Sequence, residues 1–186
     1  MNILIYKWLL TVILVAFLLA SIQPIVAAGS SDSTLRLGLT EGEFTIMNSV
    51  AQPWHDANFF GFTHVPLVIF KPDFNIAPGL AASWDIASDD KSVKFNLVKN
   101  ATWSDGHPVT AEDVAFTIDY WSKNNIGSEG TWYQSYLDHV DVLDNHTVNV
   151  AFKEPIAFDA LMAEIPGTYI LPKHVWENVK SPKEYD

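Results

Sequence analysis

The chain has 186 residues, with 11 Lys and Arg against 22 Asp and Glu, a formal net charge of −11 and no cysteine. That length suits one domain or one large lobe. The acidic balance argues against a nucleic-acid partner, because phosphate binding needs clustered Lys and Arg. The lack of cysteine excludes disulfides, thiol catalysis and the acylated cysteine that anchors bacterial lipoproteins.

Residues 1–28 have the pattern of a secretory signal peptide and are set apart from the fold. Lys7 is their only charge, residues 8–20 are apolar except for one threonine, and Val26-Ala27-Ala28 offers a small-residue cleavage site. The alternative is an uncleaved anchor that tethers the protein to the membrane. That run is shorter than the ~18 to 20 residues that span a bilayer, and Pro24 interrupts any extension.

The first elements are short. Leu35, Leu37 and Leu39 alternate with other residues and predict a strand, whereas residues 44–64 show little periodicity. Residues 65–70 predict a second strand with its proline at the start, because proline cannot donate to a ladder. Residues 71–75 predict a turn.

Residues 80–97 predict a strand, a turn and a second strand. Val93, Phe95 and Leu97 alternate with polar residues, which is typical of a half-buried strand with its apolar side facing a core. The turn lies at residues 88–91.

A tight turn and a capped helix follow. Asp105-Gly106 predicts the turn, and the Thr110 hydroxyl is placed to accept a bond from a free amide of the first helical turn. Glu112 and Asp113 lie where the helix dipole favours negative charge. The helix carries one apolar face, formed by Val114, Ile118 and Trp121. Those features together predict a helix start near residue 111.

The last third of the chain predicts a loop, a hairpin and a helix. Residues 124–130 have loop composition, and residues 139–143 and 147–152 form a hairpin with its turn at 144–146. Residues 157–165 carry apolar side chains on one face of a helix. The tryptophans at 84, 103 and 121 are interpreted as core residues.

The run from residue 80 to residue 121 resembles the signature region of the family 5 solute-binding proteins, the extracytoplasmic receptors of peptide and nickel importers driven by ATP-binding cassettes. The matching residues are Leu80, Ala81, Trp84, Ser88, Asp89, Lys91, Phe95, Leu97, Lys99, Trp103, Asp105, Gly106, residues 108–114 and Phe116. Two positions differ from the family pattern. Asp90 replaces a glycine, and aspartate tolerates positive φ at some cost, while Ser104 replaces a common histidine. Residues 65–75, 139–152 and 169–176 resemble further family segments.

The resemblance implies an α/β fold, namely the first lobe of a periplasmic-binding-protein-like structure of type II, cluster C. Such a lobe has a mixed β-sheet, β-hairpins and packed helices. Residues 29–64 and 169–186 would form part of its base, and residues 65–168 an inserted hairpin and helix subdomain. The second lobe is expected to be missing, so that the sequence resembles the N-terminal part of a longer protein.

The function that the resemblance implies is solute capture for import rather than catalysis. A ligand would be held between two lobes and handed to permease subunits in the membrane, outside the cell or in the periplasm, with no cofactor and no nucleic acid. An oligopeptide or dipeptide fits best, and nickel or another metal complex, or an oligosaccharide, are the alternatives. Two other classes stay open: a secreted hydrolase using acids such as Asp89 or Glu112, and a surface module without a small ligand.

Five residues are candidates for ligand contact. Glu41, Gly42 and Glu43 leave the first strand where the family lines its cleft. Trp132, with Tyr133 beside it, lies in the predicted loop ahead of the second hairpin, where an aromatic face could cover apolar ligand atoms or stack on a cation. The alternative for Trp132 is packing beneath the hairpin.

No metal site is predicted. The histidines lack close partners along the sequence and no cysteine joins them, so that the spacing of metal motifs is missing. They are His55, His64, His107, His139, His146 and His174.

Overall fold

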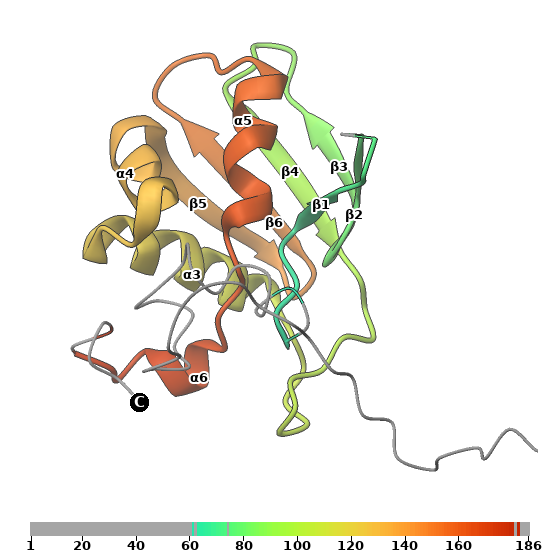
Figure 1. The fold of residues 1–186 in the computed structure, drawn as a ribbon, viewed down its shortest axis with the longest axis vertical. Coiled ribbons are helices and arrows are strands. Elements are labelled where there is room, and N and C mark those ends of the chain that lie inside the picture. The colour runs from blue at the N-terminus through green and yellow to red at the C-terminus, as the bar shows by residue number, and fades with distance from the viewer. Residues whose placement is uncertain (1–60, 62, 74, 181, 183–186) are drawn as a thin grey trace, which may run out of the picture. The chain divides into compact units, whose positions relative to one another are not determined.

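The computed structural model describes residues 61, 63–73, 75–180 and 182 (Figure 1). The chain divides into two units, residues 1–41 and 42–186, and every described residue belongs to the second. The signal peptide predicted at 1–28 and the strand predicted at 35–39 lie outside the described residues.

The described part contains six strands, four α-helices and one short 3₁₀ turn. In chain order they are β1 (Val68–Phe70), β2 (Ile76–Pro78), β3 (Ala81–Ile86), β4 (Ser92–Leu97), α3 (Ala111–Asn124), α4 (Gly127–Tyr136), β5 (Leu137–Asp144), β6 (Thr147–Phe152), α5 (Phe158–Glu164), η1 (Ile165–Gly167) and α6 (Lys173–Trp176).

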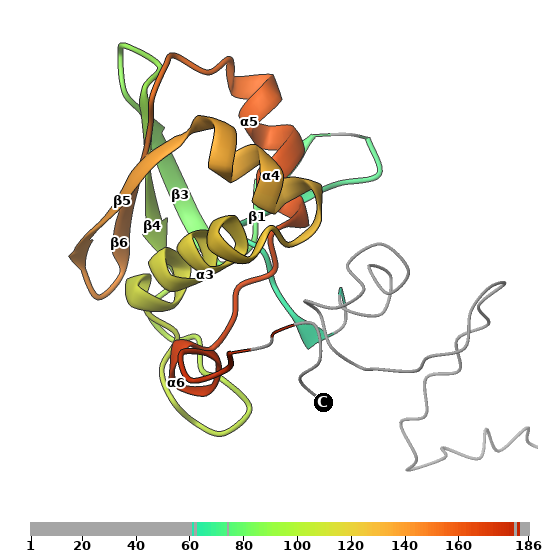
Figure 2. The ribbon, with the colours of Figure 1, turned by 90° about the vertical axis from the view of Figure 1, so that its left-hand side faces the viewer.

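Two sheets are present in this part of the chain. β1 and β2 form a two-stranded hairpin, and four longer strands form a sheet of order β3-β4-β6-β5. All pairings among these strands are antiparallel, so the expected mixture of parallel and antiparallel strands is not seen within the described residues. Figure 2 shows α3, α4 and α5 covering one face of the larger sheet.

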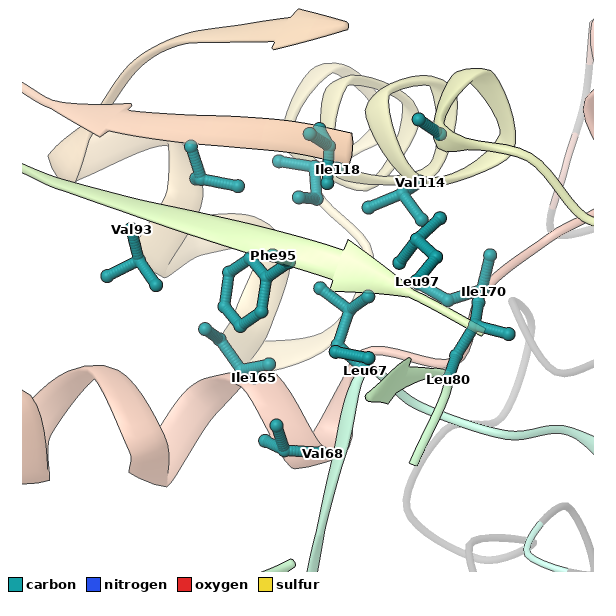
Figure 3. Close-up of a cluster of buried hydrophobic side chains, with 14 of the residues drawn as sticks. Leu67, Val68, Leu80, Val93, Phe95, Leu97, Val114, Ile118, Ile165 and Ile170 are labelled. Atoms are coloured by element: carbon teal, nitrogen blue, oxygen red, sulfur yellow. The ribbon is translucent and has the colours of Figure 1, made fainter. Parts of the chain in front are cut away.

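The core lies between β4, β6 and those helices. Burial alternates along both strands, as the period of two requires, and Val93, Phe95 and Leu97 are all enclosed. Figure 3 shows this side of β4 facing Ile118 of α3 and Ile165 of η1. The half-buried strand predicted here is therefore confirmed.

The two predicted turns that flank β4 are also confirmed. Asp90 has a φ of 55°, in the left-handed region that favours the glycine it replaces. Gly106 has a φ of 90°, and the bridge between Thr102 and Pro108 closes the loop around it. Strand β1 begins at Val68, later than predicted, because Pro66 pairs with Tyr169 as an isolated bridge instead.

Helix α3 begins and packs as predicted. Val114, Ile118 and Trp121 are at most 1% exposed. At its start, the amide of Thr110 donates to the Asp113 carboxylate over 2.8 Å, and the Thr110 hydroxyl, predicted as an acceptor, donates to the same oxygen at 3.2 Å. Of the other tryptophans, Trp84 and Trp103 are partly buried against the core.

The loop predicted at residues 124–130 is wrong for its second half, where helix α4 begins at Gly127. The composition misleads because glycine and serine disfavour helices in isolation. Tertiary packing decides here: a Cβ on Gly130 would lie 2.5 Å from the carbonyl oxygen of Trp121, so only glycine lets α4 approach α3 this closely.

The predicted second hairpin and last helix are confirmed. β5 and β6 pair across a turn at Asn145, and Asp144 accepts a hydrogen bond from the amide of His146 at 2.7 Å. On α5 and η1, Leu161, Met162 and Ile165 are buried, whereas Phe158 is 37% exposed. The core continues across the boundary predicted at 168/169, because Ile170 and Leu171 belong to the same cluster; the subdomain boundaries themselves stay predictions.

Candidate functional site

The candidate ligand residues fall into two groups. Glu41, Gly42 and Glu43 lie outside the described residues. Trp132 and Tyr133 are described, and both lie on helix α4 rather than in a loop.

Trp132 is half-buried and belongs to an aromatic cluster on α4. Its ring centroid is 5.2 Å from that of Tyr136 and 5.8 Å from that of Phe152 on β6. Tyr136 is 47% exposed. Trp132 therefore packs against the hairpin and keeps part of its surface open. Ligand contact by this residue stays a prediction.

Tyr133 points into the core. It is 2% exposed, and its hydroxyl shares a hydrogen bond of 2.9 Å with Thr168, which is also buried. Burial raises the pKa of the Tyr133 phenol far above its ordinary value. In this conformation Tyr133 holds α4 to the segment after η1, and its ring is not available to a ligand.

Two acids lie next to that contact, and sequence reasoning did not single them out. Glu129 of α4 lies against Gly167, where a Cβ would collide with its carboxylate. Burial, and then the charge of Glu129, raise the pKa of Glu164 on α5. Their environment depends on α4 meeting η1, and no spacing along the sequence signals that.

The two acids in the first turn of helix α3 have structural partners. Asp113 accepts hydrogen bonds from the amides of Thr110, at 2.8 Å, and Lys173, at 2.9 Å. Glu112 forms an ion pair of 2.8 Å with the Lys173 ammonium group, which lowers the pKa of the Glu112 carboxyl. A general acid working near neutral pH needs a raised pKa, so this environment disfavours the hydrolase alternative for Glu112.

Asp89, the other acid of the hydrolase alternative, also has a local structural role. Its carboxylate accepts a hydrogen bond of 3.1 Å from the amide of Lys91 and so closes the β3–β4 turn. Asp89 is thus explained by a contact within its own turn, and Glu112 by its ion pair with Lys173 at the start of α6.

A further cluster brings together residues far apart in the chain. The Asp105 carboxylate lies 2.7 Å from Nε2 of His174 on α6 and 3.2 Å from Nδ1 of His107. The two imidazoles stack with centroids 4.3 Å apart. Hydrogen bonds from His174 and from the His107 amide hold the pKa of the Asp105 carboxyl down at about 2. The sequence analysis missed this grouping because only the fold brings α6 beside the turn.

A hollow of about 570 Å³ lies close to this cluster. Its lining is mainly apolar and includes Leu80, Trp103 and Ile170. The Trp103 indole nitrogen is buried and has no hydrogen-bond partner among the described residues.

Among the described residues, no helix is both long and apolar enough to cross a membrane.

Comparison with known protein families identifies the family of this chain. The model of the bacterial extracellular solute-binding proteins, family 5 (middle), matches residues 75–185, which is more than half of the chain. The chain belongs to this family. The matched residues include β2 to β6, α3 to α6 and the Asp105-Gly106 turn, so the resemblance drawn from the sequence is confirmed.

Curated relatives of this family 5 chain are binding proteins. The periplasmic oligopeptide-binding protein OppA of Escherichia coli (strain K12) is 32% identical over 127 residues, covering 58% of this chain and 23% of OppA. The periplasmic alpha-galactoside-binding protein of Rhizobium meliloti (strain 1021) is 33% identical over 119 residues, covering 60% of this chain and 17% of that protein.

Solved structures show the same fold. NikZ of Campylobacter jejuni, in complex with Ni(L-His), superposes with a TM-score of 0.56 at 29% identity, covering 62% of this chain and 23% of NikZ. AgaA of A. tumefaciens R10, in complex with agropinic acid, gives a TM-score of 0.65 at 25% identity, covering 76% of this chain and 29% of AgaA. The α/β, periplasmic-binding-protein-like fold is therefore confirmed.

The chain spans less than a third of each of these relatives. The matched part fits one lobe of the two-lobed fold that the resemblance implied.

Proposed function

We propose that the protein binds a solute outside the cytoplasm for uptake by an ABC transporter, and that the solute is an oligopeptide or dipeptide. The observation that carries this proposal is the family match across residues 75–185. The peptide class is supported by the relative OppA, an oligopeptide-binding protein, and by peptide-binding relatives from Brucella. Extended peptides suit such a site because strand edges and loop amides can satisfy their backbone groups.

A metal complex or an oligosaccharide is the second candidate. The neighbour NikZ was solved with Ni(L-His), and an oligopeptide-binding protein from Thermotoga maritima was solved with mannohexaose at 28% identity and a TM-score of 0.58. The family fold therefore accommodates ligands of unlike chemistry, and the test must include all three classes.

In this proposal the exposed part of Trp132 covers apolar or cationic ligand atoms, and Glu41, Gly42 and Glu43 supply polar contacts. Tyr133 supports the site from behind, because its bond to Thr168 fixes α4. The lobes close around the ligand by hinge motion, and the closed form docks on the permease subunits. Capture requires no turnover, so the protein is not an enzyme.

The proposal also places the protein beyond the cytoplasmic membrane, either in the periplasm or on the outer cell surface. It is supported by periplasmic relatives and by the signal pattern of residues 1–28. N-terminal sequencing of exported protein should give a sequence that starts near Gly29. A start at Met1 on membrane-bound protein would favour the anchor alternative.

Calorimetry on the full-length protein, meaning the protein with both of the lobes that the resemblance implies, tests the function. Tri- and tetrapeptides, mannohexaose and the nickel–histidine complex are titrated separately, and we expect saturable binding of one peptide per protein. Trp132→Ala should weaken binding by roughly 2- to 30-fold, the equivalent of ~0.5 to 2 kcal/mol for an aromatic contact. Trp84→Ala, which removes another half-buried tryptophan on edge strand β3, is the matched control. Peptide hydrolysis, or no binding of any class, would refute the proposal.

A further inference from the structure

The turn between β4 and α3 and the short helix α6 meet at three side chains with metal-binding atoms. They are Asp105, His107 and His174, and one ligand atom from each lies within 4.8 Å of the others. The turn and α6 lie side by side in both ribbon views (Figures 1 and 2). All three residues are exposed, so an ion could reach them from solvent.

We propose that Asp105, His107 and His174 bind a divalent transition-metal ion such as Zn²⁺ or Ni²⁺. The bound ion would link the turn at residues 102–108 to α6. The site is distinct from the candidate solute residues on α4, and it does not depend on the proposed function. Its ligand would be the bare cation with water in the remaining coordination positions.

The donor set fits such an ion. Imidazole nitrogens and a carboxylate oxygen are ordinary ligands of Zn²⁺ and Ni²⁺, and three protein ligands with open positions form a known type of zinc site. Bond lengths of about 2.0 to 2.2 Å place neighbouring ligand atoms roughly 3.3 Å apart in a tetrahedron. The Asp105 oxygens already lie 2.7 Å from His174 Nε2 and 3.2 Å from His107 Nδ1.

Hydrogen bonds to backbone amides position the three ligand residues before any ion binds. The amide of His107 donates to Asp105 Oδ1 at 3.1 Å, and Gly106 between them has a positive φ of 90°. On the other side, the amide of Lys173 is fixed by Asp113, which positions the start of α6 and with it His174. Such preorganisation lowers the entropy lost when the ion binds.

The chain's formal net charge of −11 also favours cation capture. Charge alone would favour many surface positions equally, however. His139 is the informative comparison, because it contacts Asp138 at 2.9 Å and Asp141 at 3.2 Å through opposite ring nitrogens. His139 thus supplies a single imidazole between two acids, whereas Asp105, His107 and His174 bring one carboxylate and two imidazoles within 4.8 Å of one another.

Calorimetry of the tag-free full-length protein with ZnCl₂ tests the site. We expect one Zn²⁺ per chain, with the affinity weakened at least about tenfold by His107→Ala and by His174→Ala. His139→Ala and His146→Ala are matched controls that should leave it unchanged. His107→Ala is the more decisive variant, because its side chain is 62% exposed and its backbone bond to Asp105 remains.

Thermal melts with and without ZnCl₂ supply a second readout. Zn²⁺ should raise the Tm of the parent protein and of His146→Ala but not that of His107→Ala, and circular dichroism confirms that each variant folds. Zn²⁺ binding that survives the change of both His107 and His174 would show an adventitious ion on the acidic surface only, and would overturn the proposal. So would the absence of Zn²⁺ binding by the parent protein. Neither result affects the peptide titrations, so the two proposals fail independently.

Discussion

At the scale of single residues, two polar side chains of helix α3 accept hydrogen bonds from backbone amides of distant residues. Asp113 is 5% exposed and its two oxygens each accept a backbone amide, one from its own helix start and one from the returning segment at Lys173. The hydroxyl of Thr117 accepts a hydrogen bond of 2.9 Å from the amide of Leu171. Side chains of helix α3 thus hold the backbone of residues 171–173.

The Tyr133–Thr168 bond should show strong coupling. Tyr133→Phe removes one partner and leaves a buried hydroxyl unsatisfied, which costs about 1 to 3 kcal/mol of unfolding free energy, and Thr168→Val should do likewise. In the double variant no polar group is left unpaired, so its cost should be less than the sum. Urea unfolding of the four proteins measures this, and strictly additive losses would contradict the contact.

The Asp144 carboxyl makes the stability of the hairpin turn depend on pH. Hydrogen bonds from the amide of His146 and from Thr147 lower the pKa of Asp144 in the folded protein. A lowered folded pKa stabilises the fold at pH values above the ordinary carboxyl pKa, and that stabilisation is lost as the pH falls through the folded pKa.

Asp144→Ala should therefore lower the Tm at pH 7, and the difference from the parent protein should shrink as the pH falls below about 4. Melting curves across this range, recorded for both proteins in the same buffers, provide the measurement. A Tm difference that stays constant down to pH 2 would mean that the charge of Asp144 plays no part.

At the scale of elements, close approach decides where helices can lie. Helix α4 has almost no amphipathic pattern, and it is held by its contact with α3 through Gly130 and by the buried Tyr133. The β5–β6 turn likewise reaches α3, because the Asn145 carbonyl accepts the amide of Ala111 at 2.9 Å. These contacts connect the hairpin and both helices into one structural unit.

Gly130→Ala should be destabilising even though alanine is the better helix former. Its Cβ would lie 2.5 Å from a backbone oxygen that cannot move aside, and such overpacking typically costs about 1 to 3 kcal/mol. Ser128→Ala, at an exposed position of the same helix, is the control and should change stability little. Equal unfolding free energies for Gly130→Ala and the parent protein would show that α4 lies farther from α3.

At the scale of the whole molecule, the described residues form a four-stranded antiparallel sheet with α3, α4 and α5 on one face (Figure 2), a separate β1–β2 hairpin and one buried hydrophobic cluster. The proposed mechanism needs two lobes that enclose a ligand. A single lobe would contact the solute from one side only and leave the other side in water.

Residues 29–186 alone should therefore bind peptides weakly or not at all. Calorimetry with the peptide that binds best to the full-length protein is the appropriate measurement, and circular dichroism must show that the shorter chain is folded. Micromolar affinity for residues 29–186 would contradict a two-lobed site.

The features that could be read from the amino-acid order are those set by neighbours in the chain. The alternation of Val93, Phe95 and Leu97, the capped start of α3 and the turn at Asp90 each depend on a few adjacent residues, and the family motif consists of such local patterns. Three features were decided by tertiary packing instead: the helical state of residues 127–136, the burial of Tyr133, and the meeting of Asp105 and His107 with His174. Each requires segments distant in sequence to come together, and local periodicity carries no information about such contacts.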